Sequence, residues 1–460
     1  MSRRVFVKEH RRADGSVVKA HWKTVHEGDH VLSTAKNTSL SGVKSDFQTT
    51  TPSPEPILLS DNAEKVIDSL LEIGTPYIVG GAVRDSVMGN GEPKDIDIEV
   101  HGDITMEHMV QHLRSHGFSA DEVGKSFGVL KVVCGGEDFD VSLPRRDSLP
   151  DDRGSGKHTD ISAVVDGTMG VEEASRRRDF TINAIMYDPD KEEYIDPHGG
   201  LSDIKDGILR AVDEDSFAED PLRVLRGVQF SGRFDMDLDK DTEELCRSLR
   251  PSGLARERIA GELRKMVLKS TNFDQGVATL YSVGWQEVAS SLNGKRPVDP
   301  CTLSRITSHP DPRVAMGMAT SYISSLYGMG REEEHKSQIS RDLMLSKVER
   351  RHAGWFNCAP TTHADYSRVL RGAYDAGVDY DTIDLVLRNR DIDDRRFARP
   401  WEGAPPPYEV DGNRLREMGY TPSPAFKHII REAQERQDSG HPLSEPELRR
   451  LANHKIRHFG

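Results

Sequence analysis

The stretch from residue 77 to residue 100, YIVGGAVRDSVMGNGEPKDIDIEV, constrains the fold of this chain more than any other. Its first apolar residues predict a buried strand, and the Gly-Gly pair after them predicts a tight turn into a helix over residues 82–88. After a break rich in Gly, Asn and Pro, a second strand begins at Asp95. Because side chains alternate across a strand, Asp95 and Asp97 lie on one face and the isoleucines on the other. The pattern predicts a strand–turn–helix–strand unit of α/β type.

Two carboxylates on one strand face repel each other unless a cation lies between them. Magnesium is the usual cation, because proteins bind it through one or two carboxylates together with substrate phosphates. The Gly80-Gly81 turn lets backbone N–H groups and a helix N-terminus approach an anion closely. Arg84 adds a planar fork of donors suited to phosphate. Alone, a Gly-Gly pair is usually an ordinary turn and a D-x-D a solvated strand face, but the combination predicts a phosphate and magnesium site.

GGAVRD followed by a lone D-x-D resembles the head domain of the class II nucleotidyltransferases, the family of CCA-adding tRNA nucleotidyltransferases and bacterial poly(A) polymerases. The resemblance implies an α/β, polymerase-β-like nucleotidyltransferase head followed by all-α neck, body and tail domains. It also implies that Asp95 and Asp97 hold two Mg²⁺ ions. A strand predicted over residues 138–143 supplies a third catalytic carboxylate. The family pattern matches Asp140, with Asp138 as the alternative, and a plain polar strand face is the simpler explanation.

Further motifs extend the resemblance to a nucleotide site. Arg145 stands where the CCA-adding relatives keep an arginine that contacts the triphosphate, and the polar segment 147–159 resembles their mobile loop. The family's RRD-x-x-x-N motif includes Arg178, Asp179 and Asn183, and the resemblance assigns these residues to the sugar and phosphates of the incoming nucleotide. A structural ion pair between Arg178 and a nearby carboxylate is the alternative.

Asp220, Arg223 and Arg226 recur every three residues after a Pro at a good helix start. In the family the first Asp and Arg read the base, and Arg226 would lie toward the triphosphate. A carboxylate can accept from the amino group of C or A while a guanidinium donates to the neighbouring ring nitrogen. U and G present the reverse order, which costs about 1–3 kcal/mol for each mismatched group. Many relatives have a further Arg where this chain has Gln229, and a solvated helix face is the alternative reading of the stripe.

The composition limits what else the chain can be. With 460 residues it is too long for one core, and two to four domains are expected. A net charge of −14 argues against indiscriminate nucleic-acid binding but allows a local basic surface for RNA. No apolar run of about 18 residues predicts a membrane span, and the first residues lack the apolar segment of a signal peptide. Four scattered cysteines favour a reducing cytoplasm over a disulfide framework or structural zinc.

The predicted organisation is a basic N-terminal hairpin (1–30), a flexible linker (31–58), the catalytic head (59–166), a nucleotide-selecting neck (167–275), a helical body (276–400) and a tRNA-binding helical tail (401–460). The tail pattern G-x-x-L-x-x-x-G-Y-x-P-x-P-A-F resembles the CCA-adding branch. Lys427, Arg431 and Arg436 are candidate contacts to RNA phosphates, with solvated surface charge as the alternative.

Two pairs elsewhere receive no catalytic role. Arg258 and Glu262 are expected to make packing contacts or ion pairs, and His309 with Asp311 lacks the companions of an HD metal site.

Taken together, the resemblance implies template-independent addition of CCA to the 3′ end of tRNA from CTP and ATP, with release of pyrophosphate. A poly(A) polymerase, a CC-only or A-only enzyme and a catalytically silent RNA-binding relative remain alternatives. The sequence does not define the oligomeric state.

Overall fold

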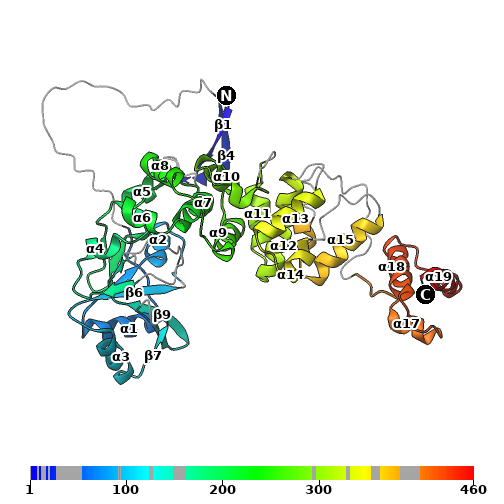
Figure 1. Cartoon of the computed structure of the whole chain (residues 1–460), viewed down its shortest axis with the longest axis horizontal. Helices are drawn as coiled ribbons and strands as arrows, with labels where there is room; N and C mark the ends of the chain where they lie inside the picture. The colour runs from blue at the N-terminus through cyan, green and yellow to red at the C-terminus, as the bar shows by residue number, and fades with distance from the viewer. Residues whose placement is uncertain are drawn as a thin grey trace. The chain divides into compact units, whose positions relative to one another are not determined.

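The computed structural model describes residues 2–7, 10–11, 17–18, 21–26, 54–91, 93, 95–123, 128–148, 162–292, 297–327, 332–353, 363–383 and 405–459. The chain separates into two compact units, Met1–Ser53 and Pro54–Gly460 (Figure 1).

The first unit is built from short antiparallel strands. β1 (Ser2–Val7) pairs with β4 (His21–His26), and β2 (His10–Arg11) pairs with β3 (Val17–Val18). These nested pairs form a hairpin. Residues 12–16, between β2 and β3, and most of the predicted linker lie outside the described residues.

The head of the second unit is a mixed sheet of seven strands in the order β13-β12-β5-β6-β9-β8-β7, with β6 and β9 as its parallel pair. Its strands are β5 (Thr75–Val79), β6 (Ile96–His101), β7 (Ser119–Val123), β8 (Val129–Cys134), β9 (Glu137–Ser142), β12 (Met186–Asp188) and β13 (Glu193–Ile195). Its helices are α1 (Asp61–Leu71), α2 (Gly81–Val87) and α3 (Met106–Ser115). The predicted α/β head is confirmed, and β12 and β13 join its sheet from beyond the predicted boundary at residue 166.

Local sequence explains why the head elements form where they do. Ser60 Oγ accepts a hydrogen bond from Ala63 N and caps α1, as the sequence allowed. α1, α3 and the sheet bury one shared apolar core. On β6 the predicted alternation holds, because Ile96 and Ile98 are buried while Asp97 on the other face is half-buried.

After the head, the chain is mainly helical. The helices up to residue 289 are α4 (Val171–Ser175), η2 (Thr181–Asn183), α5 (Gly200–Asp206), α6 (Glu214–Glu219), α7 (Leu222–Phe234), α8 (Lys240–Ser248), α9 (Arg256–Lys269), α10 (Phe273–Ser282) and η3 (Gln286–Ala289). Short strands pair as β10 (Arg145–Ser148) with β11 (Ser162–Val165) and as β14 (Ile208–Leu209) with β15 (Asp237–Leu238). Helix α7 packs against both α9 and α10.

Two helices separated by a break follow β15. Pro251 and Gly253 lie in the interruption between α8 and α9. Next along the chain, α10 is followed by the short 3₁₀ turn η3.

The remaining helices are α11 (Pro300–Thr307), α12 (Pro312–Tyr327), α13 (Glu332–Asp342), α14 (Lys347–Ala353) and α15 (His363–Asp375), then α17 (Gly412–Glu417), α18 (Ala425–Asp438) and α19 (Glu445–Phe459). One apolar core runs from Phe180 to Ile383, whereas the last three helices bury a core of their own. No described helix has the length and hydropathy needed to cross a bilayer.

Candidate functional site

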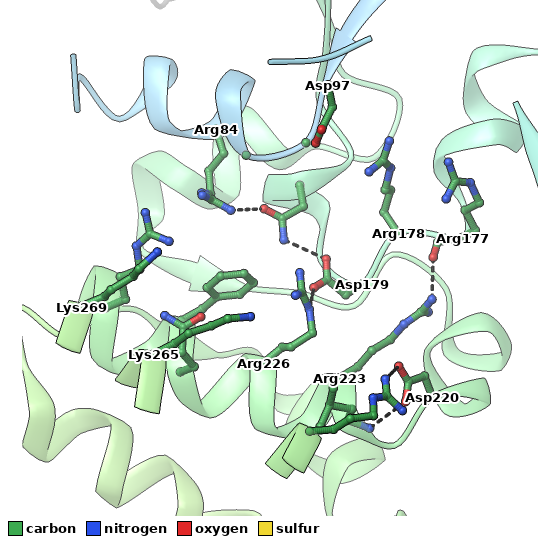
Figure 2. Close-up of a pocket in the computed structure, with 18 residues that line it drawn as sticks. Arg84, Asp97, Arg177, Arg178, Asp179, Asp220, Arg223, Arg226, Lys265 and Lys269 are labelled. Atoms are coloured by element: carbon green, nitrogen blue, oxygen red, sulfur yellow. Dashed lines mark hydrogen bonds and ion pairs between the residues drawn. The ribbon is translucent and has the colours of Figure 1, made fainter. Parts of the chain in front are cut away.

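A cavity of about 490 Å³ is lined by residues of the glycine turn, β6, α2, α7 and α9 and of the segment before η2 (Figure 2). Nine of its lining residues are cationic: Arg84, Arg177, Arg178, Arg223, Arg226, Arg233, Arg258, Lys265 and Lys269. Three are acidic: Asp97, Asp179 and Asp220. Nine positive charges against three negative ones leave an excess of six, which suits a highly charged anion.

Asp97 lies beside the glycine turn at one end of this cavity. The β5–β6 register pairs Val79 with Asp97, so the turn that follows β5 reaches the carboxylate. A Cβ at Gly80 would lie 3.4 Å from Asp97 Oδ2, and the φ of +73° at Gly80 disfavours any other residue. Burial raises the pKa of Asp97, and nearby Asp140 and Asp95 raise it further against the opposing charge of Arg178. A partly buried carboxylate thus faces a turn that only glycine can form.

The three predicted metal ligands come from adjacent strands. Asp95 is exposed just before β6, and the parallel β6–β9 register places Asp140 beside Asp97. Asp138 instead lies 3.3 Å from Lys131 Nζ on β8, so the geometry favours Asp140 over the alternative. Oxygen-only donors fit a hard cation such as Mg²⁺. Among the described residues, the oxygens of these three aspartates do not all lie within 4.8 Å of one another.

A chain of buried hydrogen bonds joins α2 to α7 across the cavity wall (Figure 2). Arg84 Nη1 donates to Asn183 Oδ1 at 2.6 Å, and Asn183 Nδ2 donates to Asp179 Oδ1 at 2.8 Å. Arg226 Nε then donates to the other Asp179 oxygen at 2.6 Å. Burial opposes the charge of Asp179, but Arg226 and Asn183 outweigh it and lower the pKa of this carboxyl. These four predicted nucleotide-binding residues therefore hold one another in place.

Arg84 is fixed further by aromatic and acidic neighbours. Its guanidinium lies 5.3 Å from the ring centre of Phe230 and 4.8 Å from that of Phe234, and its Nε donates to Asp85 at 2.8 Å. Burial lowers the pKa of Arg84 while Asp85 opposes the shift. The predicted phosphate ligand is thus a buried, oriented cation.

Glu99 is a site residue that the sequence reasoning missed. It is fully buried, and its Oε2 accepts a hydrogen bond from Arg177 Nη2 at 2.8 Å and lies 3.7 Å from Arg178 Nη2. Its Oε1 lies 3.2 Å from His101 Nε2. Although burial opposes the charge, His101, Arg178 and Arg177 lower the pKa of Glu99 to about 2. The sequence contained a signal for Glu99, because it follows Asp97 by two residues and so lies on the same strand face. The alternative expected for Arg178, an ion pair with a carboxylate, is present.

The predicted base-reading pair also has partners within the protein. Asp220 Oδ2 accepts from Arg258 Nη2 at 2.8 Å, and its Oδ1 accepts from Leu222 N. Arg223 Nη1 donates to the Ser216 carbonyl at 2.6 Å and Nη2 to the Arg177 carbonyl at 2.7 Å. Both side chains line the cavity, in fixed orientations. The expectation that Arg258 makes an ion pair is confirmed, and Glu262 pairs with Lys265 in the same way.

Other predicted residues lie elsewhere. Arg145 begins β10 and is not among the described residues that line the cavity. Lys427, Arg431 and Arg436 are exposed on α18, where Arg431 also pairs with Glu435.

Two further predictions concern positions away from the cavity. The predicted loop 147–159 lies mostly outside the described residues. Asp311 is bound by Arg313, in line with the absence of a metal assignment there.

Several lining residues of the cavity had no predicted role there, among them Arg233, Lys265, Lys269 and Gln229. Arg233, Lys265 and Lys269 extend its positive wall, and the i, i+4 spacing of the two lysines on α9 was the signal in the sequence. Burial and the charges of Arg233 and Lys265 lower the pKa of Lys269. Gln229 is 2% exposed, and its Nε2 has no hydrogen-bond partner among the described residues.

Comparison with known proteins agrees with this arrangement. Residues 76–210 match the family described as the poly A polymerase head domain. The multifunctional CCA protein of Xylella fastidiosa (strain 9a5c) is 34% identical over 210 residues, which cover 45% of this chain and 47% of that protein. The A-adding tRNA nucleotidyltransferase of Aquifex aeolicus is 34% identical over 203 residues, 43% of this chain and 23% of that protein. The chain thus spans about half, or less, of the length of these curated relatives.

Solved structures share the fold over most of the chain. The Bacillus stearothermophilus CCA-adding enzyme in complex with CTP gives a TM-score of 0.57 at 22% identity, over 87% of this chain and 99% of that chain. A CCA-adding enzyme in apo form II gives 0.52 at 18% identity, over 85% and 93%. These likenesses establish the fold, a head domain with a mixed sheet followed by helical domains.

Proposed function

We propose that the protein adds CCA to the 3′ end of tRNA, because residues 76–210 match the family described as the poly A polymerase head domain. CTP and ATP are the substrates, no nucleic-acid template directs the choice, and pyrophosphate is released. The 3′-hydroxyl of the RNA attacks the α-phosphorus of the bound nucleotide. One relative at 34% identity is a multifunctional CCA protein, and that name supports this reaction.

The observation that carries the proposal is Asp97 beside Gly80 at the end of a cavity with six excess positive charges. A nucleoside triphosphate brings about four negative charges, which such a wall neutralises at low desolvation cost. Gly80 and Gly81 let the phosphates approach the backbone, while Arg84 and Arg226 provide cations already oriented by Asn183 and Asp179. Positioning and charge stabilisation supply most of the catalysis in such reactions.

Asp95 and Asp97 would hold two Mg²⁺ ions, with Asp140 beside them on the neighbouring strand. The all-oxygen donor set fits this ion. When bound, Mg²⁺ supplies charge neutralisation for the attacking and leaving oxygens. Arg178 keeps a positive charge beside the Asp97 carboxylate. Its Nη1 would lie 3.6 Å from a Cβ at Gly80. Asp179, Asn183 and Arg145 are proposed to act with these residues toward the sugar and phosphates.

Asp220 and Arg223 are proposed to read the base. Arg223 is held by two backbone carbonyls, which fix the plane of its guanidinium. The bonds from Arg258 and Leu222 fix the orientation of the Asp220 carboxylate in the same way. An acceptor beside a donor matches C and A, and U and G then leave polar groups unpaired.

An A-only enzyme is the second candidate, because the A-adding enzyme of Aquifex aeolicus matches with the same identity as the CCA protein. In either case the exposed Lys427, Arg431 and Arg436 of α18 are proposed to contact tRNA phosphates. We place the reaction in the cytoplasm, consistent with free thiols at Cys134, Cys246 and Cys301.

The decisive experiment incubates the purified chain with tRNAs that lack CCA, lack A only, or are complete. CTP, ATP, UTP and GTP are offered singly and together with Mg²⁺. Addition of C, C and A followed by termination supports the proposal. Addition of A to the tRNA that ends in CC, without C addition, supports the A-only enzyme, and long A tails support a poly(A) polymerase. No incorporation from any mixture overturns all three.

A further inference from the structure

A cluster on the outer layer of the head has no part in the nucleotide site. Glu72 follows the last residue of α1, His112 lies in the last turn of α3, and His116 is the residue directly after α3. Their ligand atoms all lie within 4.8 Å of one another, and none of the three lines the cavity. We propose that Glu72, His112 and His116 bind one borderline divalent transition-metal ion, with Zn²⁺ as the ion that fits best.

The distances agree with a tetrahedral site. Glu72 Oε2 lies 3.3 Å from His116 Nε2 and 3.8 Å from His112 Nε2. Zinc bonds to histidine and carboxylate are about 2.0–2.2 Å, so neighbouring ligand atoms lie roughly 3.3–3.5 Å apart. Two imidazoles and a carboxylate are donors that zinc, nickel and copper accept and that Mg²⁺ rarely uses. A small movement of His112 would bring its Nε2 to the distance from Glu72 Oε2 that a tetrahedral zinc site needs.

In metal-binding histidines the ring nitrogen that does not bind the metal usually donates a hydrogen bond, and His116 already has such a bond. His116 Nδ1 lies 3.0 Å from the His112 carbonyl oxygen, which can only accept, so Nδ1 carries the proton. In the neutral ring Nε2 then presents a lone pair toward Glu72 Oε2 at 3.3 Å. Two lone pairs at that distance repel unless a proton or a cation lies between them. A metal ion between the two atoms removes this repulsion.

His112 must exchange one partner. Its Nε2 donates to the Ser69 carbonyl of α1 at 2.8 Å, so metal binding replaces that hydrogen bond with a metal bond and requires the ring proton to move from Nε2 to Nδ1. His112 and His116 stack with ring centres 4.3 Å apart, which limits how far either ring can turn. Side-chain exposure of 11% for His112 and 38% for His116 leaves an open path for the ion.

The expected consequence is a cross-link between two helices of the head. α1 and α3 contact each other and share the apolar core of the sheet. An ion that binds only the folded arrangement stabilises it by mass action. The readout can therefore be binding and unfolding, with no reference to nucleotidyl transfer.

The test uses the full chain without a polyhistidine tag, stripped with a chelator and kept in excess Mg²⁺ so that the aspartates of the cavity do not take zinc. Titration calorimetry with ZnCl₂ at pH 7.5 should show one saturable site, and the unfolding temperature should rise by several degrees. His116→Gln and Glu72→Gln should each weaken zinc affinity at least tenfold. Because both side chains are exposed, unfolding in chelator should match that of the wild type.

Two variants control for chance histidine binding. His108→Gln changes a histidine of α3 outside the cluster. His458→Gln breaks the pair His454 and His458 on α19, which has the same spacing and a ring distance of 4.6 Å. Both should keep the site. The proposal is overturned if the wild type shows no saturable zinc binding, if His116→Gln keeps it, or if His458→Gln abolishes it.

Discussion

Glu99 Oε2 accepts a hydrogen bond from Arg177 Nη2 at 2.8 Å, and Arg177 is one of the residues that line the cavity. Since Glu99 is fully buried and its neighbours are Arg177, Arg178 and His101, one carboxylate offsets several positive charges. The acid therefore acts through the arginines, as a positioning residue for the RRD segment.

Glu99→Gln tests this role. The amide cannot balance the arginine charges, so we expect a loss of roughly 1–3 kcal/mol in the free energy of unfolding and a fall in kcat/KM of about tenfold or more. The pKa near 2 is below the ordinary value of 4.5, so wild-type stability from Glu99 is present above about pH 4.5 and is lost as the pH falls toward 2. Unfolding measured against pH should show this acid loss only in the wild type. Glu172→Gln, at an exposed pair with Arg176, should change neither quantity.

Asp97→Asn should separate stability from activity. Burial raises the pKa of Asp97 above that of an unfolded carboxyl, so the folded state binds the proton more tightly. Stability from this group is highest below the unfolded value of about 3.9 and falls as the pH rises through the folded value. The neutral amide removes that cost, and we expect a slightly higher unfolding temperature at pH 7, by about 1–2 °C. Nucleotide incorporation should vanish, and turnover near the wild-type rate would refute the metal assignment.

Asn183→Leu should break the chain of hydrogen bonds that joins α2 to α7. Arg84 Nη1 and Asp179 Oδ1 lose their shared partner in a buried site, at a cost of about 1–3 kcal/mol each. Thermal unfolding and the KM for nucleotide are the measurements, and both should worsen. Asn413→Leu, at an exposed asparagine on α17, is the matched control. If the two substitutions changed thermal unfolding and KM equally, these hydrogen bonds would have no structural role.

Asp220→Ala should relax selection of C and A more than it weakens triphosphate binding. The measurement is the ratio of kcat/KM for CTP to that for UTP, which we expect to fall about tenfold or more. Asp220 also pairs with Arg258, so Arg258→Ala is needed as a second variant. If Arg258→Ala alone reproduces the loss of discrimination, the ion pair is responsible and the proposed base contact is wrong.

Replacing Lys427, Arg431 and Arg436 together by alanine should raise the KM for full-length tRNA. Each lost phosphate contact should also reduce the slope of log affinity against log salt by about one. A minihelix limited to the acceptor stem should react as before if these cations contact RNA outside that stem. Lys240→Ala with Arg250→Ala removes exposed charge from another part of the chain. An unchanged salt slope in the triple variant would leave these residues as plain surface charge.

The sequence by itself determined the strand, turn, helix and strand of residues 77–100 and the alternation that puts Asp97 and the isoleucines on opposite faces. These features follow from local rules, because glycine tolerates a positive φ and a strand has a period of two. The helix that carries Arg223 and Arg226 was likewise readable from its spacing and from the proline before it, although it begins at Leu222, so that Asp220 precedes it.

Only the tertiary structure decided the partners of these residues. Glu99 is a site residue because Arg177, which lies 78 residues later in the chain, donates a hydrogen bond to it. Asn183 is one because it forms hydrogen bonds with both Arg84 and Asp179. The pairing of Asp97 with Asp140 depends on strand register, which alternation alone does not give. Hydrogen bonds and ion pairs act over about 3 Å in space, whereas sequence patterns report only neighbours along the chain.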